Sequence, residues 1–329
     1  MKRNLTLDVA KGIGIILVIL GHALQYGAGL DTKGAMDLGL EKFIISFHMP
    51  LFMLISGYLF CGTFHRKTSK EIMRKNCRRF LVPISFMTLL HCLQSNHSVS
   101  KINNFFLALP ETFIGTLWFF WSILLITAIF CLYRWAFGKK DWGLIVVACL
   151  AVVLPDYYPL KIAVHLLPVF VVGYFLGKRN FFAKNRGAIF ILCIIIYIFL
   201  YSAFGFDKMI YFSPFSIWAQ QPMTDVLMLD AYRFTLGIAG SMALLIALRK
   251  MGGCFQTLQT YLARVGSKTF ELYVFQDFLL LMLHPLFKHF DSRYVYAKGI
   301  TSFFLIFLLS IALTKLSEKY KYLGLILGK

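Results

Sequence analysis

Acidic residues are scarce in this chain, and charged residues of either sign are few. Asp and Glu together occupy 15 of 329 positions and all charged residues make up 15%, whereas apolar residues make up 59%. Soluble domains contain about 45–50% apolar and about 25% charged residues. This imbalance, with a mean hydropathy of +0.71, excludes a soluble domain and indicates an integral membrane protein.

Basic residues outnumber the acidic ones and give a net charge of +19. In a soluble chain such an excess suggests nucleic-acid binding. Here Lys and Arg lie mostly in short segments between apolar runs, where such residues determine the orientation of membrane helices. We therefore expect no nucleic-acid partner.

Closely paired cysteines are also missing, because the seven cysteines include no CxxC pair. This spacing argues against a disulfide framework and against a zinc site. His91, Cys92 and His97 are near one another in sequence, but we expect no metal there. Most of the cysteines are predicted to pack as small apolar residues.

Apolar runs that could cross the ~30 Å hydrocarbon core of a bilayer recur along the whole chain. No internal repeat or low-complexity linker separates them, so residues 1–329 are predicted to form a single integral-membrane domain. The predicted fold class is all-α, a polytopic bundle of about ten transmembrane helices. The expected spans are about 5–25, 42–60, 79–95, 112–134, 142–156, 160–178, 187–204, 230–249, 267–288 and 296–315.

The segments between these spans indicate the orientation. The longest polar segments are 26–41, 96–111, 205–229 and the basic 61–78. The N-terminus, the C-terminus and alternate loops carry 24 Lys and Arg residues, and the remaining loops carry 8. Because Lys and Arg accumulate on the cytoplasmic side, both termini are predicted to be cytoplasmic.

The first span carries Asp8, Lys11 and His22, although ionisable residues are costly in a membrane. On an ideal helix, Lys11 and His22 point within about 20° of one direction and lie ~16 Å apart along the axis. Asp8 and Gln25 fall within ~60° of the same line. This face is expected to look into the bundle or a water-filled cavity. Asp8 and Lys11 also have the spacing of a structural ion pair.

The second span contains a further histidine, His48, at a depth similar to that of His22. Pro50 disturbs the helix just after it and leaves carbonyl groups for polar partners. Two histidines at one depth on sequential helices favour an acid/base pair. A packing role for either histidine is the alternative.

The basic segment 62–79 has two interpretations. It can set the topology and contact anionic lipid headgroups. It can also form a phosphate site, with Arg78 and Arg79 at the start of the third span and Lys11 near the same level, since guanidinium groups suit phosphate oxygens.

Five motifs together resemble acyltransferase family 3, whose polytopic members acylate cell-surface sugars. They are "LDVAKGIGIILVILGH", "FHMPLFMLISGYLF", "RRFLVP", "LWFF" and "VGSKTFELYVFQ". The family signature is a basic residue, most often arginine, eleven positions before a histidine. Here that residue is Lys11, as in sequences resembling fucose 4-O-acetylases, so the charge is kept while the bidentate fork of arginine is lost.

The resemblance implies a role for individual residues. His22 would be the catalytic histidine, Lys11 its basic partner and Asp8 the acidic residue of the same motif. His48 matches the histidine of the second motif. Arg78 or Arg79 matches the arginine of the third, and Trp118 the aromatic residue of the fourth. Related chains often have histidine where this chain has Gln276, so a hydrogen-bonding role, rather than proton transfer, is expected there.

The resemblance also implies the reaction. Acetyl-CoA would enter from the cytoplasm past Lys11 and the basic segment, and an acceptor hydroxyl of a cell-surface or lipid-linked saccharide would arrive from the outer side. Neutral His22 would act as general base, and an acyl-histidine relay is the second alternative. The family would place the protein in a bacterial inner membrane, in contact with lipids.

The acceptor side is expected to include Gln25, Gln276, Trp118 and Arg233. Arg233 can instead simply pair with Asp230 or Asp225. The aromatic segment 205–222 can stack on sugar rings or anchor the protein at the membrane interface.

A different functional class is a proton-coupled transporter or flippase of saccharides, because intramembrane Asp, Lys and His also serve proton coupling. Such proteins often contain paired repeats with broken helices, and the sequence shows none. The sequence therefore favours the enzyme.

Overall fold

Helices make up nearly all of the computed structural model. It describes residues 4–27, 30, 32–37, 39–95, 102–138, 140–154, 157, 160–183, 187–210, 221–251, 255–287 and 294–328, and no strand occurs among them. The α-helices are α1 (Leu5–His22), α2 (Thr32–Asp37), α3 (Leu40–Arg66), α4 (Ser69–Ser95), α5 (Ile102–Gly115), α6 (Trp118–Phe137), α7 (Gly143–Leu150), α8 (Leu160–Lys178), α9 (Gly187–Ser202), α10 (Met223–Lys250), α11 (Gln256–Ser267), α12 (Thr269–Phe287), α13 (Val295–Lys319) and α14 (Lys321–Ile326).

The predicted fold class is confirmed. Six helices of the described chain are long and apolar enough to cross a membrane: α1 with the turn that follows it, α3, α6, α8, α10 and α13. Nine of the ten expected spans coincide with the main part of one helix, and the span 112–134 contains the end of α5 and most of α6. Membrane crossing by α4, α7, α9 and α12, and the cytoplasmic position of both termini, stay predictions.

The basic segment 61–78 is not the loop that we expected. Helix α3 continues to Arg66 and α4 begins at Ser69, so only two residues separate them. The reason is a capping box, in which the Thr68 N–H and hydroxyl both donate to the Glu71 carboxylate at 2.8 Å. The hydrogen bonds from the Thr68 backbone and side chain lower the pKa of Glu71 below its ordinary value.

The expected span 112–134 is broken into two helices. Helix α5 ends at Gly115, and Leu117 adopts a left-handed conformation with φ of 49° before α6 begins at Trp118. The indole N–H of Trp121 donates to the Phe113 carbonyl at 3.0 Å and ties the two helices across the bend. Gly115, the last residue of α5, favours the end of the helix, and the contact of Trp121 with Phe113 stabilises the bend.

Other polar segments also contain helix. Segment 26–41 holds α2, segment 96–111 holds the first part of α5, and segment 205–229 holds the first turns of α10. The amphipathic helix α11 fills most of the connection between the spans at 230–249 and 267–288. The described parts of these polar segments are therefore partly helical.

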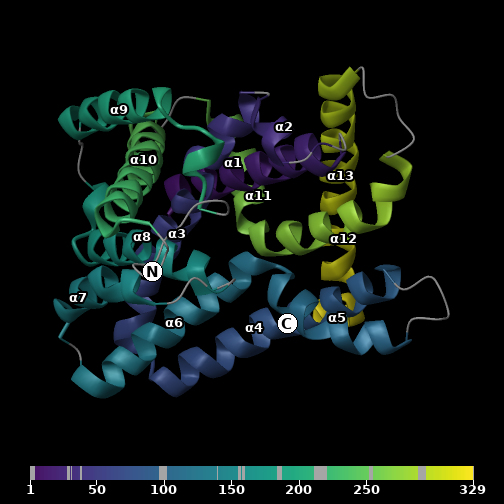
Figure 1. Ribbon diagram of the computed structural model, residues 1–329, viewed down its shortest axis with the longest axis horizontal. Helices are drawn as coiled ribbons and strands as arrows, with labels where there is room; N and C mark the ends of the chain where they lie inside the picture. The colour runs from purple at the N-terminus through teal and green to yellow at the C-terminus, as the bar shows by residue number, and fades with distance from the viewer. Residues whose placement is uncertain are drawn as a thin grey trace.

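Helix α1 lies at the centre of the packing. It contacts α3, α10, α11, α12 and α13, and Figure 1 shows it between α10 on one side and the upright α13 on the other. Its approach to α11 is closest at Gly12 and Gly266, where a Cβ would collide with the Leu262 carbonyl and the Asp8 carbonyl respectively. Close contact of this kind needs glycine on both helices.

Helices α3 and α8 pack in the same way along most of their length. A Cβ on Gly57 would strike the Phe170 carbonyl, and one on Gly173 would strike the Leu54 carbonyl. The two backbones are therefore nearly in contact, which holds α3 and its histidine in place.

We expect the Gly173→Ala substitution to lower stability, because the added methyl group cannot fit without separating α8 from α3. Overpacking of this kind costs about 1–3 kcal/mol. The matched control is Gly115→Ala, where a Cβ would meet no atom within 4 Å. Thermal unfolding of the detergent-solubilised protein measures both; equal melting temperatures for the two variants would contradict the packing described here.

Candidate active site

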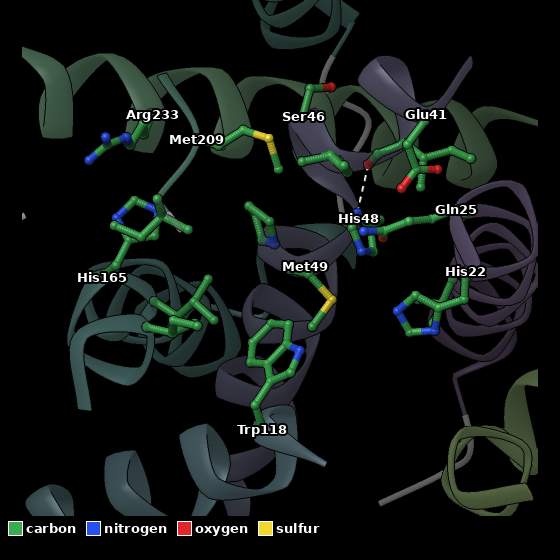
Figure 2. Close-up of a pocket in the computed structure, with 18 of the residues that line it drawn as sticks. His22, Gln25, Glu41, Ser46, His48, Met49, Trp118, His165, Met209 and Arg233 are labelled. Carbon is green, nitrogen blue, oxygen red and sulfur yellow. Dashed lines mark hydrogen bonds between the residues drawn. The ribbon is translucent and has the colours of Figure 1, made fainter. Parts of the chain in front are cut away.

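A cavity of about 340 Å³ opens beside the end of α1, and we call it the histidine cavity. Its wall is formed by residues of α1, α3, α6, α8, α10 and α12 and of segment 204–210. Figure 2 shows His22 on one side, His165 and Arg233 on the opposite side, and His48 and Met49 between them. The polar lining residues are His22, Gln25, Tyr26, Glu41, Ser46, His48, Trp118, His165, Lys208, Arg233 and Tyr273.

His22 is the last residue of α1, and a π-helical turn, η1 (Ala23–Gly27), follows it directly. Such turns occur frequently at functional sites. His22 Nδ1 lies 3.1 Å from Oε1 and 3.0 Å from Nε2 of Gln276, which is buried on α12. This hydrogen bond joins two of the motifs, because His22 ends "LDVAKGIGIILVILGH" and Gln276 ends "VGSKTFELYVFQ". The turn also places Gln25 at the wall of the same cavity.

His48 reaches the same cavity from α3. Its Nδ1 lies 2.7 Å from the Ile44 carbonyl oxygen, one turn earlier in the helix. A carbonyl group only accepts hydrogen bonds, so Nδ1 carries the hydrogen. The neutral ring then has its acceptor at Nε2.

Arg233 and Trp118 complete the wall away from His22. The Arg233 Nη1 lies 2.8 Å from Asp230 Oδ1, and its Nε donates to the Lys208 carbonyl at 2.8 Å. The pairing with Asp230 that the sequence offered as an alternative therefore forms, and Arg233 also faces the cavity. Trp118 lies beneath Met49 in Figure 2, at the start of α6.

A second cavity, of about 390 Å³, lies further toward the start of α1, and we call it the basic cavity. Lys11 and Arg79 line it together, among many aromatic rings. Lys11 Nζ lies 2.7 Å from Asp8 Oδ1, so the ion pair expected from their spacing is present. The Arg79 guanidinium lies over the Phe270 ring, 4.6 Å from its centroid, in a cation–π contact.

Of the two arginines of the third motif, only Arg79 lines the basic cavity. The carbonyl oxygen of Arg78 instead lies beside Gly328, close to the C-terminal helix α14. Adjacent residues on a helix point about 100° apart, so the two cannot face the same cavity equally.

The two cavities share a wall. Val18, Met49 and Tyr273 line both of them. The face of α1 that carries Lys11 and His22 therefore borders both cavities, with Lys11 at the basic cavity and His22 at the histidine cavity. Two reactants could enter separate compartments and meet at this wall.

Several lining residues were not predicted from the sequence, among them the ionisable residues Glu41 and His165. Glu41 lies just before the expected span 42–60, so it was not predicted as an ionisable residue inside a membrane helix. His165 stands in an apolar run on α8, and no motif points to it. A scan for every ionisable residue inside or next to a span would have found both.

Part of the expected acceptor side lies outside the described residues. This applies to residues 211–220 of the aromatic segment 205–222, whereas Lys208, Met209 and Ile210 line the histidine cavity. His97 of the sequence cluster is likewise outside them. Among the residues that are described, no group of His, Cys, Asp and Glu could hold a metal ion.

Comparisons with known proteins give relatives over most of the chain. The chain is 27% identical to the nodulation protein NolL of Sinorhizobium fredii over 297 residues, which cover 84% of this chain and 77% of that protein. It is 40% identical to the nodulation protein NolL of Mesorhizobium japonicum over 124 residues, 37% of this chain and 33% of that protein. No solved structure gives a significant match.

The profile of the Acyl_transf_3 family, described as an acyltransferase domain, matches residues 4–316. That range contains both cavities and all the residues that line them. The resemblance given by the five motifs is thereby confirmed. The chain belongs to the Acyl_transf_3 family and is a membrane-bound O-acyltransferase.

Proposed function

We propose that this protein transfers a short acyl group, acetyl in the first instance, from cytoplasmic acyl-CoA to a hydroxyl group of a saccharide. The observation that carries the proposal is the position of Lys11 and His22 on one helix, each lining one of two adjoining cavities. This arrangement suits a reaction in which an anionic donor and a neutral acceptor approach from opposite sides.

The basic cavity is the proposed donor site. The phosphates of coenzyme A would lie at its mouth near Arg79 and Lys11, while the thin pantetheine arm enters between the aromatic rings. Asp8 holds the Lys11 ammonium at this cavity. Because Asp8 offsets the charge of Lys11, Arg79 is the stronger candidate for a direct phosphate contact.

His22 is the proposed general base. If Gln276 Oε1 accepts the hydrogen of His22 Nδ1, then Nε2 is free to take a proton. The acceptor oxygen attacks the thioester carbonyl carbon as Nε2 removes its proton. The C–S bond of the resulting tetrahedral intermediate breaks, and the coenzyme A thiolate leaves and takes the proton from His22. An acyl-histidine intermediate is the second route.

The histidine cavity is the proposed acceptor site. Gln25 and Arg233 offer hydrogen-bonding groups at its wall, and Trp118 offers an indole face against a sugar ring. His48 would orient the acceptor, or His22 itself, through Nε2. The acceptor is proposed to be a cell-surface or lipid-linked saccharide.

The proposed setting is a bacterial inner membrane. Residues 1–329 would form one integral-membrane domain with both termini in the cytoplasm, which places the basic cavity on the side where acyl-CoA is present. Membrane lipids would surround the apolar outer helix faces.

His22→Ala is expected to reduce transfer by about 10²–10⁴-fold, the usual contribution of a general base. The assay follows label from radiolabelled acetyl-CoA into the saccharide fraction of membranes that contain the protein. His65→Ala is the matched control, since the exposed His65 bonds to Tyr174 and lines neither cavity. Full transfer by His22→Ala at equal expression would refute the assignment, as would transport of a saccharide without acyl transfer.

Arg79→Ala is expected to raise KM for acetyl-CoA by about 10–100-fold, because hydrogen bonds to charged groups contribute about 1.5–3 kcal/mol. The neighbouring Arg78→Ala is the control and should leave this KM within about twofold. Steady-state kinetics in detergent give both values. Equal effects of the two substitutions would exclude the proposed donor site.

Lys11→Arg is expected to retain donor use, since it keeps the positive charge beside Asp8, whereas Lys11→Ala removes that charge. The alanine variant should raise KM for acetyl-CoA and also lower the melting temperature, because it breaks the ion pair with the buried Asp8 carboxylate. Lys11→Ala with unchanged acetyl-CoA dependence would remove Lys11 from the donor site.

A further inference from the structure

Glu41 is an acidic residue of the histidine cavity to which neither the motifs nor the proposed reaction gives a role. It lies in the first turn of α3 and is only 3% exposed. Figure 2 shows its carboxyl group on the same side of the cavity as His22, with Gln25 between them. Glu41 therefore lines the proposed acceptor site.

The surroundings of Glu41 leave its hydrogen-bonding capacity unused. Within the part of the chain that the structure describes, its buried Oε2 has no hydrogen-bond partner. Asp8 is paired with Lys11 and Asp230 with Arg233, while among the described residues Asp277 Oδ2 also lacks a hydrogen-bond partner and lies 4.0 Å from His91 Nε2. A buried polar group without a partner lowers the stability of the fold. A substrate that supplies the missing donors would recover part of that loss.

The recess that holds this carboxyl group depends on a glycine beside the catalytic histidine. A Cβ on Gly21 would lie 2.8 Å from Glu41 Oε2 and 3.2 Å from Oε1. Any larger residue at position 21 would push the carboxyl group away from α1. The glycine thus lets an acceptor-binding group and the base approach each other across two helices.

We propose that Glu41 binds the acceptor by accepting hydrogen bonds from two neighbouring hydroxyl groups of a sugar ring. This inference rests on the proposed function and deepens it, since it names the acceptor as a saccharide with adjacent hydroxyls. An ionised carboxylate offers two acceptor oxygen atoms in one plane, which suits two adjacent O–H donors. The hydroxyl that is acylated is a third one, next to this pair on the ring; its single proton is directed toward His22, which takes it, and Glu41 exchanges no proton.

Selectivity follows from the same arrangement. An acceptor with a single hydroxyl leaves Oε2 buried and unpaired, and sites built to bind a substrate hydroxyl discriminate by up to ~10⁴-fold against analogues that lack it. Glu41 therefore favours acceptors that present two adjacent hydroxyls.

The test is Glu41→Gln, which keeps the size of the side chain and replaces one acceptor oxygen with a donor. The acceptor probe is the saccharide-bearing lipid extract of membranes in which the wild-type protein incorporates label, added in a dilution series with radiolabelled acetyl-CoA. We expect at least a tenfold rise in the apparent KM for the extract and an unchanged KM for acetyl-CoA. Glu41→Asp should recover part of the loss, and the exposed Glu71→Gln is the control.

Thermal stability separates this role from a structural one. Removing an unpaired buried charge should leave the melting temperature of Glu41→Gln unchanged or higher. An unchanged apparent KM for the extract would overturn the inference. A lower melting temperature combined with equal rises in KM for acetyl-CoA and for the extract would also overturn it. The proposed function fails separately, if wild-type protein transfers no label or His22→Ala transfers it fully.

Discussion

The cost of placing ionisable groups in a membrane helix governs how α1 sits in the bundle. Asp8, Lys11 and His22 cannot face lipid without a large penalty, so α1 must be surrounded by partners. The structure meets this need with an ion pair between Asp8 and Lys11 and with the bond from His22 to Gln276. Helices α3, α10, α11, α12 and α13 all contact α1. Its polar face consequently turns toward internal cavities.

Separation of the two cavities has a chemical consequence. Acyl transfer requires a donor and an acceptor to meet while water is kept away from the thioester. The apolar side chains of Val18 and Met49, with the ring of Tyr273, form the wall at which the two would meet. Close glycine packing of α3 against α8 holds Met49 on this wall and His48 at the histidine cavity. The same packing thereby links stability of the bundle to the geometry of the site.

Hydropathy predicted the all-α membrane fold and the approximate positions of the helices, and the motifs led to His22, Lys11 and Gln276. The sequence did not predict the break at Leu117, because a left-handed residue depends on tertiary contacts such as the Trp121 bond. Nor did it choose between Arg78 and Arg79, which requires the rotation of α4 about its axis. Glu41 and the π-helical turn after His22 were missed, since neither changes the apolar pattern of its segment.

The central claim is that donor and acceptor occupy adjoining cavities and meet beside His22. Cryo-electron microscopy of the protein with a thioether analogue of acetyl-CoA, which cannot transfer its acyl group, tests it most directly. The account predicts phosphate density near Arg79 and Lys11 and the acyl group at the wall formed by Val18, Met49 and Tyr273, facing His22. Analogue density elsewhere, with an empty basic cavity, would contradict it.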